Sequence, residues 1–155
     1  MPETHAHQAD ARLTLRSQLE DLARVWPWID ALAAEYGIPA DTRFKIDLCL
    51  EEALSNIVRH GYGGEPDHAI TVVFDPEGES GLTFIVEDNA PPFSPLAEPG
   101  PPHPRAAPTS IDRIEPGGNG LRLLRKFAGS LRYERLPGRN RLTISFPVTP
   151  AIPIG

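Results

Sequence analysis

The sequence has little that could cross-link it, bind a structural metal or hold it in a membrane. Cys49 is its single cysteine, which excludes an intrachain disulfide and any zinc site built on several thiolates. No run approaches 18 apolar residues, and the start lacks the basic and apolar regions of a signal peptide. With 15 Lys and Arg against 21 Asp and Glu, the net charge is −6. This charge argues against a general nucleic-acid or anionic-membrane binder, so we expect a cytoplasmic protein without direct contact to either.

Proline, in contrast, is in excess. The 155 residues are enough for one domain. They include 18 prolines, about 12% of the sequence, whereas proline usually makes up about 5%. Nine of the prolines fall between Ala90 and Gly118, where they exclude both a helix and a central strand. A loop of this length inside a compact domain is typical of a functional lid or a linker.

Two helices are expected in the first 60 residues. Ser17 and Glu20 have the spacing of a capping box, and apolar residues then recur at helical intervals up to Tyr36. Pro27 lies inside this first helix, and we expect it to kink the helix. A second amphipathic helix is predicted over residues 42–60.

Strand-like segments make up most of the remaining sequence. Alternating or β-rich runs predict strands over residues 12–16, 70–74, 82–86, 131–134 and 142–146, and a third helix is predicted over residues 120–128. Because most of these strands are joined as hairpins, we expect an α+β fold. Its form would be a two-layer α/β sandwich, with a mixed, mostly antiparallel sheet and helices on one face. The domain is expected to span residues 11–147, between a flexible tail of residues 1–10 and a tail of residues 148–155.

A polar stripe on the second helix is the first candidate site. Glu52, Asn56 and His60 recur every four residues along one edge of the apolar face. Glu51 lies about 100° around the helix from Glu52, on a different stripe. For this helix alone, an ordinary solvated row of polar side chains is an equally good explanation.

Two other stretches are candidates as well. Asp88 follows an apolar strand, an arrangement that is also typical of simple turn chemistry. Residues 117–121, Gly-Gly-Asn-Gly-Leu, lead into a helix, and backbone N–H groups at such a helix start can bind phosphate. A flexible hinge explains these glycines equally well.

Taken together and in this order, the three stretches resemble the nucleotide-binding motifs of the GHKL ATPase and kinase superfamily. Within it the likeness is greatest to the anti-sigma-factor serine/threonine kinases. Residues 52–62, which end in His-Gly-Tyr, resemble the N box, residues 88–95 the first glycine box, and residues 118–121 the second. Residues 133–146 resemble the closing hairpin of that family. The resemblance covers about residues 10–147 and implies the Bergerat ATP-binding fold.

The resemblance also implies a role for individual residues. Glu52 would be the general base, Asn56 the protein ligand of Mg²⁺, and Asp88 the acceptor for the adenine amino group. Thr143 would point toward adenine, and residues 90–118 would form the ATP lid. The other implied nucleotide-binding residues are His60, Ala90, Gly118, Asn119, Gly120, Leu121 and Arg113.

Two positions depart from the family's pattern. Ala90 stands where the first glycine box normally has glycine, and its methyl group could crowd the nucleotide only if φ there must be positive. Pro116 stands at the place of the usual lid arginine, and Arg113 and Arg105 are the nearest alternatives. These departures bear on phosphotransfer more than on nucleotide binding.

The resemblance implies a kinase that uses ATP and Mg²⁺ to phosphorylate a STAS-domain anti-sigma-factor antagonist and that also binds a sigma factor. Relatives in that family commonly form homodimers, and the sequence leaves monomer and homodimer open. One alternative is a regulatory module that binds ATP or a partner without kinase turnover, which the altered lid favours. Another is a detached histidine-kinase-like ATPase domain, which the His-Gly-Tyr ending of residues 52–62 disfavours.

Overall fold

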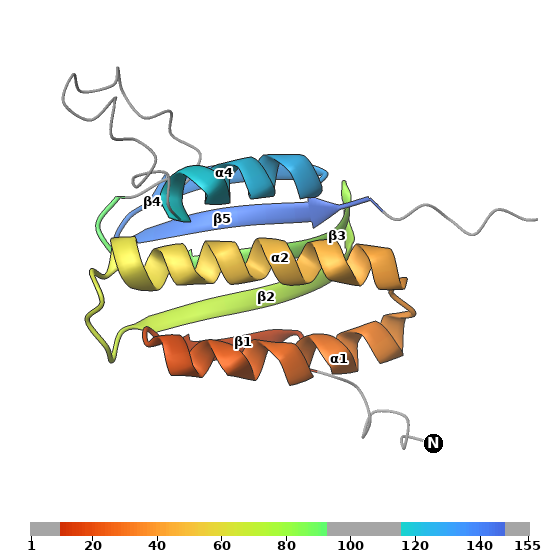
Figure 1. The fold of residues 1–155 in the computed structure, drawn as a ribbon, viewed down its shortest axis with the longest axis horizontal. Coiled ribbons are helices and arrows are strands. Elements are labelled where there is room, and N and C mark those ends of the chain that lie inside the picture. The colour runs from red at the N-terminus through yellow and green to blue at the C-terminus, as the bar shows by residue number, and fades with distance from the viewer. Residues whose placement is uncertain (1–9, 93–115, 148–155) are drawn as a thin grey trace, which may run out of the picture.

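The computed structural model describes residues 10–92 and 116–147 (Figure 1). The predicted lid, residues 90–118, therefore lies largely outside the described residues, as do Arg113 and both predicted tails except Asp10. The elements in chain order are β1 (Arg12–Arg16), η2 (Leu19–Arg24), α1 (Val25–Tyr36), α2 (Ala40–Asn56), η3 (Ile57–Gly61), β2 (Ala69–Gly78), β3 (Gly81–Asp88), α4 (Pro116–Phe127), β4 (Ser130–Leu136) and β5 (Arg139–Phe146).

The five strands form one antiparallel sheet in the order β1-β2-β3-β5-β4. Helices α1, α2 and α4 all lie on one face of this sheet, with α2 between the other two (Figure 1). The predicted α+β fold, a two-layer sandwich with helices on one face, is confirmed. No helix in the described ranges is long and apolar enough to cross a bilayer.

The core lies between the helices and the sheet. Alternate residues of each central strand point to the helices, and Phe84 on β3 is fully buried at their centre. Its ring contacts the rings of Trp28, Phe74 and Phe146, with centroids 6.1, 5.0 and 6.2 Å away.

Cys49 on α2 is also fully buried, and burial raises the pKa of its thiol to about 12. The cysteine is therefore a protonated packing residue rather than a nucleophile.

The beginning of the first helix differs from the prediction. Ser17 is not an N-cap: its buried hydroxyl donates to the Glu65 carbonyl (2.7 Å) and accepts from the His68 N–H (3.0 Å). A 3-10 segment, η2, follows, and α1 begins only at Val25. Pro27 thus lies in the first turn of α1. Backbone N–H groups in the first turn have no hydrogen-bond partner within the helix, so the N–H that proline lacks is not needed there. The predicted capping box and the kink within one long helix are both wrong.

The second helix ends in an unusual turn. Regular α-helix stops at Asn56, and residues 57–61 form the π-turn η3, in which the Tyr62 N–H donates to the Ile57 carbonyl at 2.8 Å. An i→i+5 turn changes the rotational phase of the residues that follow.

The third helix begins at Pro116 rather than at residue 120, since proline is well suited to a first helical position.

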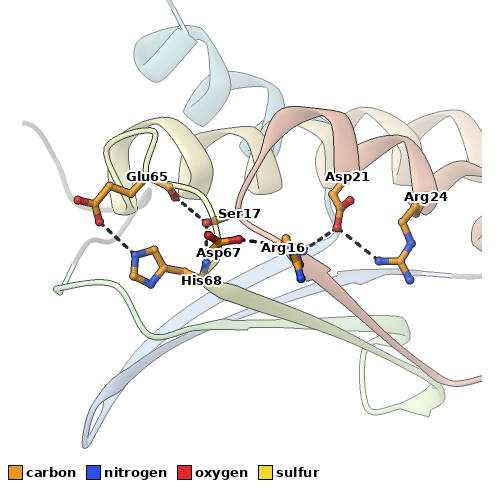
Figure 2. Close-up of polar contacts among 7 residues, drawn as sticks. All are labelled: Arg16, Ser17, Asp21, Arg24, Glu65, Asp67 and His68. Carbon is orange, nitrogen blue, oxygen red and sulfur yellow. Dashed lines mark hydrogen bonds and ion pairs between the residues drawn. The ribbon is translucent and has the colours of Figure 1, made fainter.

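Side chains of η2 cover the free edge of β1 (Figure 2). The Asp21 carboxylate accepts from the Arg16 N–H (2.8 Å), and Arg24 donates to the Thr14 carbonyl (2.9 Å). Arg16 also pairs with Asp67 (3.2 Å), which is the one described non-glycine residue with a positive φ (74°). These contacts occupy backbone groups that an added strand would need.

Candidate nucleotide-binding site

The α2 helix places two polar side chains of the predicted stripe one turn apart. Glu52 is half-buried and Asn56 is buried, whereas the neighbouring Glu51 is exposed. The structure thus separates the two adjacent glutamates as the helical periodicity predicts. His60 lies on the π-turn and is exposed, so the buried part of the stripe ends at Asn56.

Two oxygen atoms of this pair have no hydrogen-bond partner among the described residues. Within the described part of the chain, Glu52 Oε2 and Asn56 Oδ1 are both buried and unpaired. A buried polar atom without a partner costs about 1–3 kcal/mol, so each oxygen favours a ligand that supplies a donor or a cation. An amide oxygen suits a hard cation such as Mg²⁺, which usually takes few protein ligands and completes its shell with phosphates and waters. The same ranges contain no cluster of three or more His, Cys, Asp or Glu side chains that could hold a metal.

Burial also makes Glu52 a better base. Loss of solvent raises the pKa of its carboxyl, and the negative charge of Glu51 raises it further. The neighbouring Asn56 amide and nearby positive charge at Arg59 act in the opposite direction, but the pKa remains above its ordinary value. A carboxylate with a raised pKa can accept a proton more readily near neutral pH.

Asp88 is the second part of the site. It is buried at the end of β3, and its Oδ1 accepts from the Ala90 N–H and from the Asn140 side-chain amide, both at 2.9 Å. No bond from a described residue reaches the other carboxylate oxygen, Oδ2, which can therefore accept a hydrogen from a ligand. Burial raises the pKa of Asp88, while its bonds to Asn140 and Ala90 and the charge of Arg135 lower it.

Ala90 does not need to be glycine. Asp67 is the one non-glycine residue with a positive φ in the described ranges, so the backbone at position 90 is in a conformation that alanine adopts without strain. Its side chain is buried against Gly61, where an added Cβ would lie 3.3 Å from the Ala90 Cβ. The departure from the family's glycine is therefore compatible with the turn.

A set of side chains beside Asp88 was not identified from the sequence. Asn140 on β5 lies directly across from Asp88 in the sheet register. The Tyr133 hydroxyl donates to its side-chain oxygen, and Arg135 donates to the same oxygen (3.2 Å) and to the Ala90 carbonyl (2.9 Å). The apolar alternation of residues 142–146, extended back by two residues, is the sequence signal that would have put Asn140 on the inner face.

The same register corrects the expectation for Thr143. Asn140, Leu142 and Ile144 are buried on the helix side, so Thr143 points to the opposite face, beside Ile85 and Arg132 of the neighbouring strands. Asp88 points to the helix side with Asn140. Strand alternation therefore keeps Thr143 away from Asp88, and Asn140 is the β5 residue at that position.

The start of α4 lies at the same end of the molecule as the C-terminal end of α2 (Figure 1), and Asn56 is the last residue of α2. The two helices run antiparallel, and the Phe44 ring at the start of α2 meets the Phe127 ring at the end of α4, with centroids 6.3 Å apart. The backbone of Gly118, Asn119, Gly120 and Leu121 belongs to the first turns of α4. The side chains of Asn119 and Leu121 are outside the described part. A helix N-terminus there is suited to bind phosphate.

A half-buried carboxylate, a buried amide and a buried aspartate lie at one end of an antiparallel two-layer sandwich, and they make up the candidate nucleotide site. Residues 15–146 match the family described as histidine kinase-like ATPase domain, and the chain belongs to that family. It is 34% identical over 118 residues to the serine/threonine-protein kinase BtrW of Bordetella bronchiseptica. The aligned residues cover 76% of this chain and 80% of that protein. The family resemblance seen in the three motifs is confirmed, and a kinase-like, ATP-binding function is supported.

Proposed function

We propose that the protein is a serine/threonine kinase that transfers the γ-phosphoryl group of ATP to a STAS-domain anti-sigma-factor antagonist. Its release or capture of a sigma factor would then depend on the phosphorylation state of that antagonist. The observation that carries the proposal is the pair of buried, unpaired oxygens, Glu52 Oε2 and Asn56 Oδ1, one helical turn apart. Similarity to a serine/threonine-protein kinase supports a serine or threonine hydroxyl as the phosphoryl acceptor, and the STAS-domain antagonist is part of the proposal.

In this proposal each residue has one task. The acceptor hydroxyl oxygen forms a bond to the γ-phosphorus while the bond to the β–γ bridging oxygen breaks and ADP leaves. Glu52 accepts the hydroxyl proton, which its raised pKa favours. Asn56 would hold Mg²⁺ through its amide oxygen, and the ion would neutralise phosphate charge. Asp88 would accept a hydrogen bond from the adenine amino group through Oδ2.

A second candidate function is a regulatory module that binds ATP without transferring phosphate. One observation favours it: Pro116, at the start of α4, occupies the place where the family usually has a lid arginine. Arg113, the nearest replacement, lies outside the described residues. Binding and turnover must therefore be measured separately.

The test is to incubate the protein with Mg-ATP and STAS-domain proteins from the same genome, and to search for phosphoserine or phosphothreonine by mass spectrometry. Calorimetry with ATP, with and without Mg²⁺, is run in parallel. We expect ATP binding that Mg²⁺ strengthens, and one phosphorylated antagonist. Binding without any phosphorylated antagonist would favour the regulatory module, and no binding of ATP would contradict both.

A further inference from the structure

Tyr62 connects the end of the π-turn to the turn that follows Asp88. The residue is only 8% exposed. The hydroxyl accepts from the Asn89 N–H at 2.7 Å and donates to the Ala69 carbonyl at 3.0 Å. Asn89 is the residue between Asp88 and Ala90, so this single hydroxyl contacts the backbone of the turn from which the aspartate projects.

Tyr62 is itself held firmly. Its backbone N–H closes the π-turn on Ile57, and its ring stacks on His68 with centroids 4.4 Å apart and planes at 4°. His68 is fixed in turn by Ser17 and Glu65, as Figure 2 shows: its N–H donates to the Ser17 hydroxyl, and its ring lies 3.1 Å from the Glu65 carboxylate. The hydroxyl is therefore presented to Asn89 from a fixed position.

A second contact joins the same two segments. Gly61 precedes Tyr62, and a Cβ added there would lie 3.3 Å from the Ala90 Cβ. The end of η3 thus lies close enough to Ala90 to leave little room for a side chain at Gly61, and it reaches Asn89 by a hydrogen bond. The orientation of Asp88 depends on this turn, because its Oδ1 accepts from the Ala90 N–H.

We propose that Tyr62 is a positioning residue for base selection: it holds the turn over residues 88–90 so that Asp88 Oδ2 meets the amino group of adenine. The inference rests on the proposed nucleotide site. Without the tyrosine hydroxyl, the Asn89 N–H loses its acceptor, and a backbone N–H that cannot find a partner favours a rearranged turn. The carboxylate then moves with the turn, and recognition of the amino group is weakened, whereas contacts to the phosphates are not.

The test compares ATP with inosine triphosphate, which has an oxygen in place of the 6-amino group. Tyr62→Phe keeps the ring and its stacking but removes both hydrogen bonds. We expect its affinity for ATP to fall about 5-fold or more, the lower bound for an unpaired buried group, and its affinity for inosine triphosphate to change little. The matched control is Tyr36→Phe, because the Tyr36 ring is 42% exposed and packs on Phe74; both affinities should stay at the wild-type level.

Two further measurements distinguish positioning from general damage. The double variant Tyr62→Phe/Asp88→Asn should bind ATP no more weakly than Asp88→Asn alone, because Tyr62 acts through Asp88. In the wild type, the Asn89 amide should exchange with solvent more slowly with ATP than with inosine triphosphate, a result that decides the matter even if Tyr62→Phe does not fold. Equal losses for both nucleotides, or equal protection by both, would overturn the inference while leaving the nucleotide site intact. A wild-type protein that binds neither nucleotide would overturn the proposed function and this inference together.

Discussion

Glu51 and Glu52 are adjacent in the sequence, yet the helix gives them different surroundings. Glu52 is half-buried one turn before Asn56, and Glu51 is exposed to solvent. We expect Glu52→Ala to lower phosphotransfer by about 10²–10⁴-fold, the usual contribution of a general base, while ATP binding persists. Glu51→Ala is the matched control and should retain nearly full activity. If the rate of antagonist phosphorylation falls equally in both variants, Glu52 is not the general base.

The raised pKa of Glu52 predicts how both activity and stability change with pH. Phosphotransfer should decline on the acid side at a pH above the ordinary glutamate pKa of about 4.3, because burial raises the pKa of this base. A carboxyl whose pKa is raised on folding binds a proton more tightly in the native state, so its ionised form opposes folding. Glu52→Gln should therefore raise the melting temperature at pH 7.5, and the gain should shrink as the pH falls through the folded-state pKa and disappear below the unfolded-state pKa of about 4.3.

Thermal unfolding of the wild type and Glu52→Gln at pH 7.5 and at pH 4 measures this difference. Glu51→Gln, at an exposed position, should leave the melting temperature nearly unchanged at both pH values. A melting temperature for Glu52→Gln below that of the wild type at pH 7.5 would show that the ionised carboxylate stabilises the fold, contrary to this account.

At the scale of elements, sequence patterns predicted those features of the site that lie within a single helix or strand. Helical periodicity put Glu52 and Asn56 on one stripe, and the end of an apolar strand identified Asp88. Ser17 has the residue spacing of a helix cap, but its hydroxyl bonds instead to Glu65 and His68, about 50 residues away. A capping box is a local signal, and the tertiary partners of Ser17 outweighed it.

Contacts that depend on register between distant strands could not be predicted in the same way. Asn140 meets Asp88 only because β5 pairs with β3 across a separation of 52 residues. Tyr62 reaches Asn89 from the end of a π-turn, which no residue pattern in the sequence predicted. These are the parts of the candidate site that needed the structure.

The register predicts opposite outcomes for two residues of β5. Asn140→Ala removes a buried donor to Asp88 and should cost about 1–3 kcal/mol of stability, together with a loss of ATP affinity. Thr143→Ala changes a half-buried side chain on the other face of the sheet, so its ATP affinity should remain at the wild-type level. Calorimetry with ATP and thermal unfolding of both variants are the measurements. A larger loss of ATP affinity in Thr143→Ala than in Asn140→Ala would contradict the observed register.

For the molecule as a whole, the sandwich brings together segments that are far apart in the chain. The end of α2, the end of β3 and the start of α4 lie at one end of the fold (Figure 1), so the candidate site contains residues from the N box, the first glycine box and the second. The hairpin pattern was sufficient to predict the two layers. The strand order β1-β2-β3-β5-β4 is a finding of the structure, and it leaves β1 and β4 as the two sheet edges.

The covered edge of β1 gives a prediction about self-association. Asp21 and Arg24 occupy the Arg16 N–H and the Thr14 carbonyl, which would otherwise be available to pair with a strand of another molecule. We expect Asp21→Ala/Arg24→Ala to form larger species than the wild type at the same concentration, as measured by sedimentation velocity. The control is Arg132→Ala/Glu134→Ala, which removes an ion pair of 3.2 Å between side chains on β4, the other edge strand, and with it the 3.7 Å pair of Glu134 with Arg141. That variant should sediment like the wild type, because both pairs join side chains and occupy no backbone group. If both double variants sediment as the wild type does, then side chains on η2 are not what keeps the β1 edge from pairing.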